Sequence, residues 1–90
     1  MPAQLEHANF TAAGPAATAA WMQEVFGWSI RWEGDAMAGG HTKHVGTKDR
    51  YVALYNPGTE AARKPDSYKT LGGLNHVAVV VDDLEAAEQA

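Results

Sequence analysis

Cysteine is absent from this chain of 90 residues, so disulfide bonds and thiolate metal ligands are excluded. Long apolar runs are absent too, because no stretch approaches the roughly 20 apolar residues that a membrane-spanning helix needs. The N-terminus lacks the basic segment and apolar run of a secretory signal. We therefore expect a soluble, cytoplasmic protein with no membrane partner.

Positive charge is also scarce. There are 7 Lys and Arg residues against 11 Asp and Glu, which gives a formal net charge of −4. Both signs are spread along the chain, and no basic stripe is present that would neutralise phosphates. Nucleic acid is therefore not an expected partner.

Large apolar side chains are few, because 17 of the residues are alanine. A chain this short buries only about 60–65% of the surface that its unfolded form exposes, which leaves the folded state marginally stable. A bound ligand or a partner subunit would add stability, and we expect a homodimer.

One short pattern occurs twice. Leu5-Glu6-His7 lies near the start of the chain and Leu74-Asn75-His76 near its end, and the two histidines are 69 positions apart (76 − 7). Each copy begins a segment typical of a strand, and a helix start follows each segment. A supersecondary unit that recurs in this way indicates internal duplication.

Alternation or β-branched content predicts five strands, at residues 4–10, 28–33, 42–46, 50–55 and 74–81. In the second of these, Trp28, Ile30 and Trp32 are expected on one face, because alternate side chains of a strand point the same way. The fifth segment is the richest in valine and is the strongest strand signal in the chain.

Two helices are expected. Residues 15–26 are rich in alanine, begin with proline and are followed by Gly27, all of which favour a helix with a glycine cap. A second helix starts at Leu84, where Asp82 and Glu85 have the spacing of a capping box. The predicted order is therefore β-α-β-β-β, followed by a linker and β-α.

This order, with a histidine on the first strand of each repeat, resembles the vicinal oxygen chelate superfamily of glyoxalase I, bleomycin resistance proteins and extradiol dioxygenases. The matching segments are 5–10, 19–28 and 73–84. The resemblance implies an α+β fold with a first βαβββ module over 1–56, a linker over 57–73 and an incomplete second module over 74–90. We expect the chain to be a fragment of a longer protein; the alternative is a dimer that exchanges a strand or a module.

The resemblance also implies a metal site. Enzymes of this superfamily hold a divalent metal with ligands from the first and fourth strands of each module, which makes His7 and His76 expected ligands. Ala53 stands where the fourth strand often has glutamate, and His44 could replace that carboxylate if its strand face lines the cleft. Imidazole suits zinc, iron, nickel or manganese, and the sequence does not choose among them.

Three further residues are expected to bind substrate. Asn9, Tyr51 and Tyr55 would lie on the cleft face beside Ala53 and His7, where an amide and two hydroxyls can orient a polar molecule. Ala53 removes the group that most resembles a glyoxalase-type base, so the sequence assigns no catalytic residue.

Two functions follow from the resemblance. The first is a metal-dependent lyase, isomerase or dioxygenase acting on a small molecule with two neighbouring oxygens, which the metal would polarise as a Lewis acid. The alternative is a metal-free protein of the bleomycin resistance type that binds or sequesters an antibiotic or another small molecule. Aromatic side chains and the negative net charge would suit an aromatic or cationic ligand.

Overall fold

The computed structural model describes residues 2–58, 69, 71, 72, 74 and 76–89. The elements are β1 (His7–Thr11), α1 (Pro15–Phe26), β2 (Ser29–Asp35), the short 3-10 helix η1 (Met37–Gly39), β3 (His41–Gly46), β4 (Tyr51–Asn56) and α2 (Leu84–Gln89). The βαβββ order over the first 56 residues matches the predicted order, and the fold is a small α+β arrangement. The boundaries proposed at 57–73 fall mostly outside the described residues.

The strands form one mixed sheet in the order β1-β4-β3-β2. β1 runs parallel to β4, with His7 opposite Tyr51 and Asn9 opposite Ala53. The pairs β4–β3 and β3–β2 are antiparallel. The parallel pair β1–β4, at one edge of the sheet, requires a crossover, which α1 and the two following strands provide.

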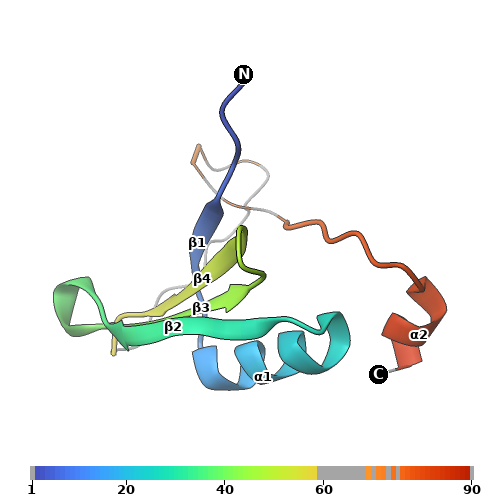
Figure 1. Cartoon of the computed structure of the whole chain (residues 1–90). Helices are drawn as coiled ribbons and strands as arrows, with labels where there is room; N and C mark the ends of the chain where they lie inside the picture. Colours follow the sequence, from blue (N-terminus) through green and yellow to red (C-terminus); the bar gives the residue numbers. More distant parts are fainter. Residues whose placement is uncertain (1, 59–68, 70, 73, 75, 90) are drawn as a thin grey trace.

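The hydrophobic core lies between α1 and one face of the sheet (Figure 1). Leu54 and Val45 are fully buried, and Ala19 of α1 is buried against them. Around this centre pack four partly buried side chains, Phe10, Met22, Trp28 and Ile30. The core is small, as the alanine-rich composition predicted, and only one face of the sheet is covered by a helix.

α1 has the predicted bounds. Pro15 occupies the first turn, where its missing N–H has no intrahelical partner to lose. Gly27 ends the helix with φ at 71°, and its N–H donates to the carbonyl of Gln23 at 3.0 Å. This left-handed conformation strains any residue with a Cβ, which is why glycine stands there.

The prediction that Trp28, Ile30 and Trp32 lie on one face of the second strand is wrong for Trp32. The register of β2 on β3 shifts between Ile30 and Trp32, which leaves Arg31 as a bulge. Ile30 therefore pairs with Val45 on the core side, while Trp32 pairs with His44 on the opposite face. A bulge inserts one unpaired residue and so reverses the alternation beyond it.

The predicted strand at 74–81 is not formed in the described residues of that segment. Residues 76–81 run as extended chain without a strand partner (Figure 1). A high valine content favours a strand only where a neighbouring strand supplies the hydrogen bonds. The incomplete second module is therefore not confirmed as a folded unit.

The second helix begins at Leu84 as predicted, but its cap is a different residue. The carboxylate Oδ1 of Asp83, rather than that of Asp82, accepts a hydrogen bond from the N–H of Ala86 at 3.0 Å. Within the described part of the chain, neither helix is long and apolar enough to cross a membrane.

Candidate functional site on the open face of the sheet

The face of the sheet opposite α1, called the open face here, carries a line of rings from all four strands. Strand register places His7 of β1, Tyr51 of β4, His44 of β3 and Trp32 of β2 on this face. We call these four residues the aromatic row. The ring centroids of His7 and Tyr51 are 4.8 Å apart, those of Tyr51 and His44 are 4.6 Å apart, and those of His44 and Trp32 are 5.1 Å apart. The row is continuous because each ring contacts the next.

Arg31 brings positive charge to the row. The bulge turns its side chain toward the open face, where the guanidinium carbon lies 4.3 Å from the centroid of the Tyr51 ring. Its Nη1 also donates a hydrogen bond to the carbonyl of Thr47 at 3.3 Å. A guanidinium stacked on an aromatic face is held in place by the ring's negative quadrupole and keeps further donors free for a ligand.

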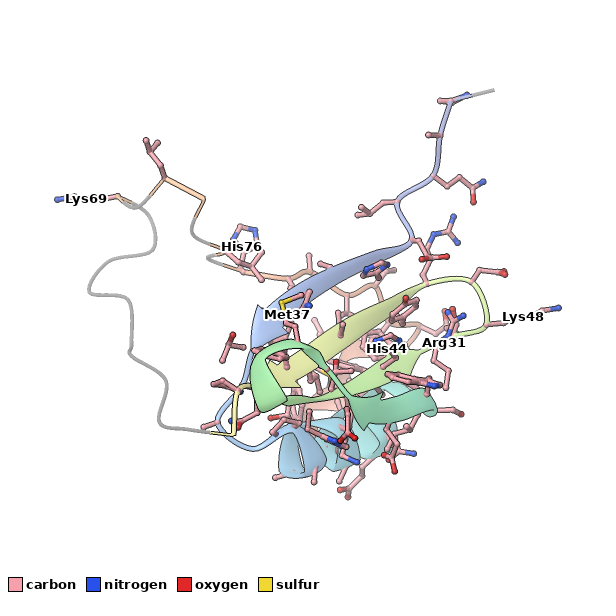
Figure 2. All side chains as sticks on the ribbon, turned by 90° about the vertical axis from the view of Figure 1, so that its left-hand side faces the viewer. Arg31, Met37, His44, Lys48, Lys69 and His76 are labelled. Carbon is pink, nitrogen blue, oxygen red and sulfur yellow. The ribbon has the colours of Figure 1, made fainter. Side chains whose placement is uncertain are left out.

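His44 lies between Tyr51 and Trp32 in the row, and its side chain is labelled in Figure 2. Burial lowers the pKa of His44 below its ordinary value, and the nearby charges of His7 and Arg31 lower it further. Both effects disfavour the imidazolium form. A neutral imidazole has one nitrogen that donates and one that accepts, so His44 can bind a polar group of either kind.

His7 lies at the edge of the sheet, on β1, and is more exposed. Its Nδ1 is 3.0 Å from Oε1 of Glu6, and 44% of its side chain remains exposed. Its ring stacks on Tyr51 with an interplanar angle of 10°. One nitrogen is therefore oriented by the neighbouring carboxylate, while the ring face is held by the tyrosine.

The predicted substrate-binding residues have different surroundings. Tyr51 is part of the aromatic row, and Asn9 lies on the same face, exposed, beside Ala53. Tyr55 is also on this face, but its hydroxyl already donates to the carbonyl of Met37 at 2.8 Å. That contact anchors η1 beside the sheet and leaves the Tyr55 hydroxyl less able to orient a ligand.

The predicted metal ligands are only partly brought together. His7 and His44 share the open face, with ring centroids 6.5 Å apart. Their planes differ by only 17° in a stacked arrangement, and imidazole lone pairs lie in the ring plane, so the two rings do not aim at one atom. Ala53, opposite His44 and Asn9 in register, offers no donor.

His76 is exposed on the C-terminal segment and lies apart from His44 in Figure 2. No group of three His, Asp or Glu residues able to hold a metal occurs among the described residues. In this conformation the described donors do not fit a metal, since a catalytic zinc typically takes three protein ligands. The assignment of His7, His44 and His76 as metal ligands stays a prediction.

Two residues of the open face were missed by reasoning from sequence. Strict alternation assigned Trp32 to the side of Ile30, and Arg31 was not among the predicted site residues, whereas the bulge brings both side chains to the open face. One signal was present in the sequence: Gly34 follows two residues after Trp32. A Cβ at Gly34 would lie 3.0 Å from the Trp32 ring, so the glycine leaves room for the ring to lie over the strand.

Comparison with known proteins identifies the family to which the chain belongs. No curated protein and no solved structure matches the chain significantly. The family model described as the Glyoxalase/Bleomycin resistance protein/Dioxygenase superfamily matches residues 4–90. That match spans both the βαβββ unit and the C-terminal segment with the second Leu-x-His pattern. The chain therefore belongs to the glyoxalase/bleomycin resistance protein/dioxygenase superfamily.

Proposed function

We propose that the chain binds a planar small molecule on the open face of the sheet without a metal ion. The observation that carries this proposal is the aromatic row, with Arg31 stacked beside it. Aromatic side chains offer flat apolar surfaces, while the imidazoles and the tyrosine hydroxyl supply a few hydrogen-bonding groups. That combination is typical of sites for small organic ligands.

The charges on the open face indicate which class of ligand it can bind. Arg31 carries a positive charge, and both His7 and His44 can donate hydrogen bonds. An aromatic molecule with an anionic group would place its ring against Trp32 or His44 and its charge near the guanidinium. The proposed ligand is therefore an aromatic carboxylate or a related planar anion, rather than the cationic ligand that the net charge had suggested.

A metal-dependent enzyme is the second candidate. It is favoured by the presence of two imidazoles, His7 and His44, on the same face of one sheet. Such a site would need rotation of at least one ring and further donors, from His76 or from outside the described residues. The family includes enzymes of this kind, so the two candidates must be separated by experiment.

The first experiment measures affinity for 2-naphthoate by calorimetric titration of the full chain in the presence of EDTA. Arg31→Gln removes the positive charge and is expected to weaken binding about three- to fivefold, the usual worth of an exposed charge pair. Lys48→Gln is the matched control, because Lys48 is exposed in the turn between β3 and β4, away from the row. Equal losses in the two variants would contradict the proposal.

The second experiment addresses the metal directly. Zn²⁺ is titrated into the metal-free protein and into His7→Ala and His76→Ala. Binding to the parent chain that is lost in both variants, together with 2-naphthoate affinity that depends on Zn²⁺, would support the enzyme candidate instead. We expect 2-naphthoate to bind equally well with and without Zn²⁺.

A further inference from the structure

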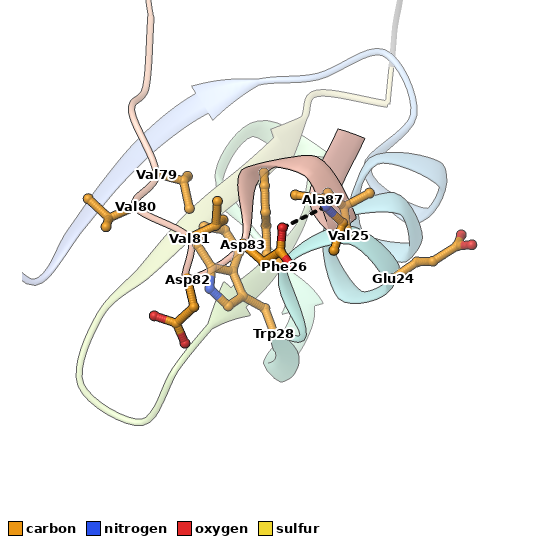
Figure 3. A pocket seen from close by; sticks show the side chains of 11 residues that line it. Glu24, Val25, Phe26, Trp28, Val79, Val80, Val81, Asp82, Asp83 and Ala87 are labelled. Atoms are coloured by element: carbon orange, nitrogen blue, oxygen red, sulfur yellow. Dashed lines mark hydrogen bonds between the residues drawn. The ribbon is translucent and has the colours of Figure 1, made fainter. Parts of the chain in front are cut away.

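A cavity lies at the end of α1, apart from the open face. Its volume is about 430 Å³, which is within the range of about 300–1,000 Å³ that is usual for small-molecule sites. Its apolar walls come from Val25 and Phe26 of α1, from Trp28, and from Val81 and Ala87 of the C-terminal segment (Figure 3). We call it the α1-end cavity. It combines residues distant in sequence and uses none of the aromatic row.

Every charged side chain that lines this cavity is acidic. Glu24, Asp82 and Asp83 line it, and no Lys, Arg or His is among its described lining residues. Asp83 is already engaged by the N–H of Ala86. Glu24 and Asp82 are exposed and make no ion pair among the described residues. The Glu24 side chain is directed away from the other lining residues, on the opposite side from Asp82 (Figure 3), so Asp82 is the carboxylate available to a ligand.

The end of α1 adds negative potential to the same place. The last residues of the helix line the cavity, and carbonyls at a helix C-terminus lack intrahelical partners. They carry the negative end of the helix dipole, which a nearby cation stabilises. The last turn of α1 holds no basic residue, and Glu24 there has the unfavourable sign. A bound cation would offset the negative potential at the helix end and the unfavourable charge of Glu24.

The aromatic walls suit the same ligand. The rings of Phe26 and Trp28 lie 4.9 Å apart at an angle of 51°, and Trp21 braces Phe26 edge-on at 5.3 Å. Tryptophan is the best side chain for binding a cation on its ring face, and the apolar walls can hold an organic group attached to that cation.

We propose that the α1-end cavity binds an arylalkylammonium ion, with its ring among Phe26, Trp28 and Val81 and its ammonium group toward Asp82. The site does not depend on the proposed function of the open face. The two sites differ in the sign of charge they select: an anion near Arg31 and a cation at the end of α1.

The test uses the full ¹⁵N-labelled chain and three soluble probes of similar size: 2-phenylethylammonium, 2-phenylethanol and phenylacetate. We expect the ammonium ion to bind most tightly and phenylacetate least. The indole N–H signal of Trp28, identified with Trp28→Phe, should shift most among the three tryptophans, together with the amides of Val81 and Ala87. Equal affinity for the three probes, no binding of the ammonium ion, or shifts centred on His44 and Tyr51 would overturn the proposal.

Variants at exposed positions test the charges without disturbing the core. The variant Asp82→Asn should weaken 2-phenylethylammonium binding about two- to fivefold and leave 2-phenylethanol binding unchanged. Glu85→Gln is the matched control, because Glu85 is an exposed acid on α2 that does not line the cavity. An equal effect of the control, or no effect of Asp82→Asn, would refute the role of Asp82. Binding of 2-naphthoate should be unchanged in all of these variants, so this proposal and the proposed function can fail separately.

Discussion

At the residue scale, His44 gives the most direct report on the electrostatics of the open face. Burial and the charges of His7 and Arg31 lower its pKa from 6.5, so the folded state binds fewer protons there than the unfolded chain. Lowering the pH therefore favours the unfolded state. The stability that depends on neutral His44 is fully present above about pH 6.5 and is lost as pH falls toward its folded pKa.

We predict that His44→Gln flattens the decline of unfolding free energy below pH 6.5, because glutamine does not titrate. Urea denaturation at a series of pH values measures this slope. His41→Gln is the matched control, since His41 is an exposed histidine on the same strand. A slope in His44→Gln as steep as in the parent chain would contradict the electrostatic account.

Thr42 gives a second prediction at this scale. Its hydroxyl is buried, with no hydrogen-bond partner among the described residues. Replacing an unsatisfied buried hydroxyl by a methyl group removes its desolvation cost, so Thr42→Val should raise the unfolding free energy by about 1 kcal/mol. Denaturant unfolding measures the change.

Thr47→Val is the control for Thr42→Val, because the Thr47 hydroxyl is exposed and accepts a hydrogen bond from the N–H of Arg50 at 3.3 Å. That variant should be neutral or destabilised. A loss of stability in Thr42→Val would mean that its hydroxyl has a partner in solution.

At the scale of elements, α1 depends on the backbone conformation of Gly27. Its φ of 71° strains other residues, while no atom lies within 4 Å of a Cβ built there. We predict that Gly27→Ala costs about 1 kcal/mol through conformation alone. Gly14→Ala, at the other end of the helix, where φ is −135°, places no residue in the left-handed region and should cost less. Thermal unfolding of both variants makes the comparison, and equal costs would contradict the role assigned to the left-handed cap.

The elements also show which local signals were sufficient. Pro15, the alanines and Gly27 act within one helix, so α1 was predicted with its observed bounds. The bulge at Arg31 depends on how β2 pairs with β3, which alternation within β2 cannot reveal. The valines at 77–81 failed as a strand for a related reason, because a strand requires a partner that local sequence does not specify.

At the scale of the whole molecule, the duplicated Leu-x-His pattern and the order of elements were enough to predict the family, which the match over residues 4–90 confirms. The site was predicted only in part. His7, His44 and Tyr51 do meet on one face, but Arg31 and Trp32 reach it through the bulge, and His76 does not join them. Residue spacing predicted correctly which face of the sheet a side chain lies on only where the strand pairing has no bulge.

The central claim is that the open face binds a planar anion without a metal. The most direct test is a titration of the full ¹⁵N-labelled chain with 2-naphthoate in EDTA, followed by amide and indole chemical shifts. We predict the largest shifts at Arg31, Trp32, His44 and Tyr51, with little change at Trp28. Shifts that appear only after a divalent metal is supplied, or that centre on the α1-end cavity, would contradict the account.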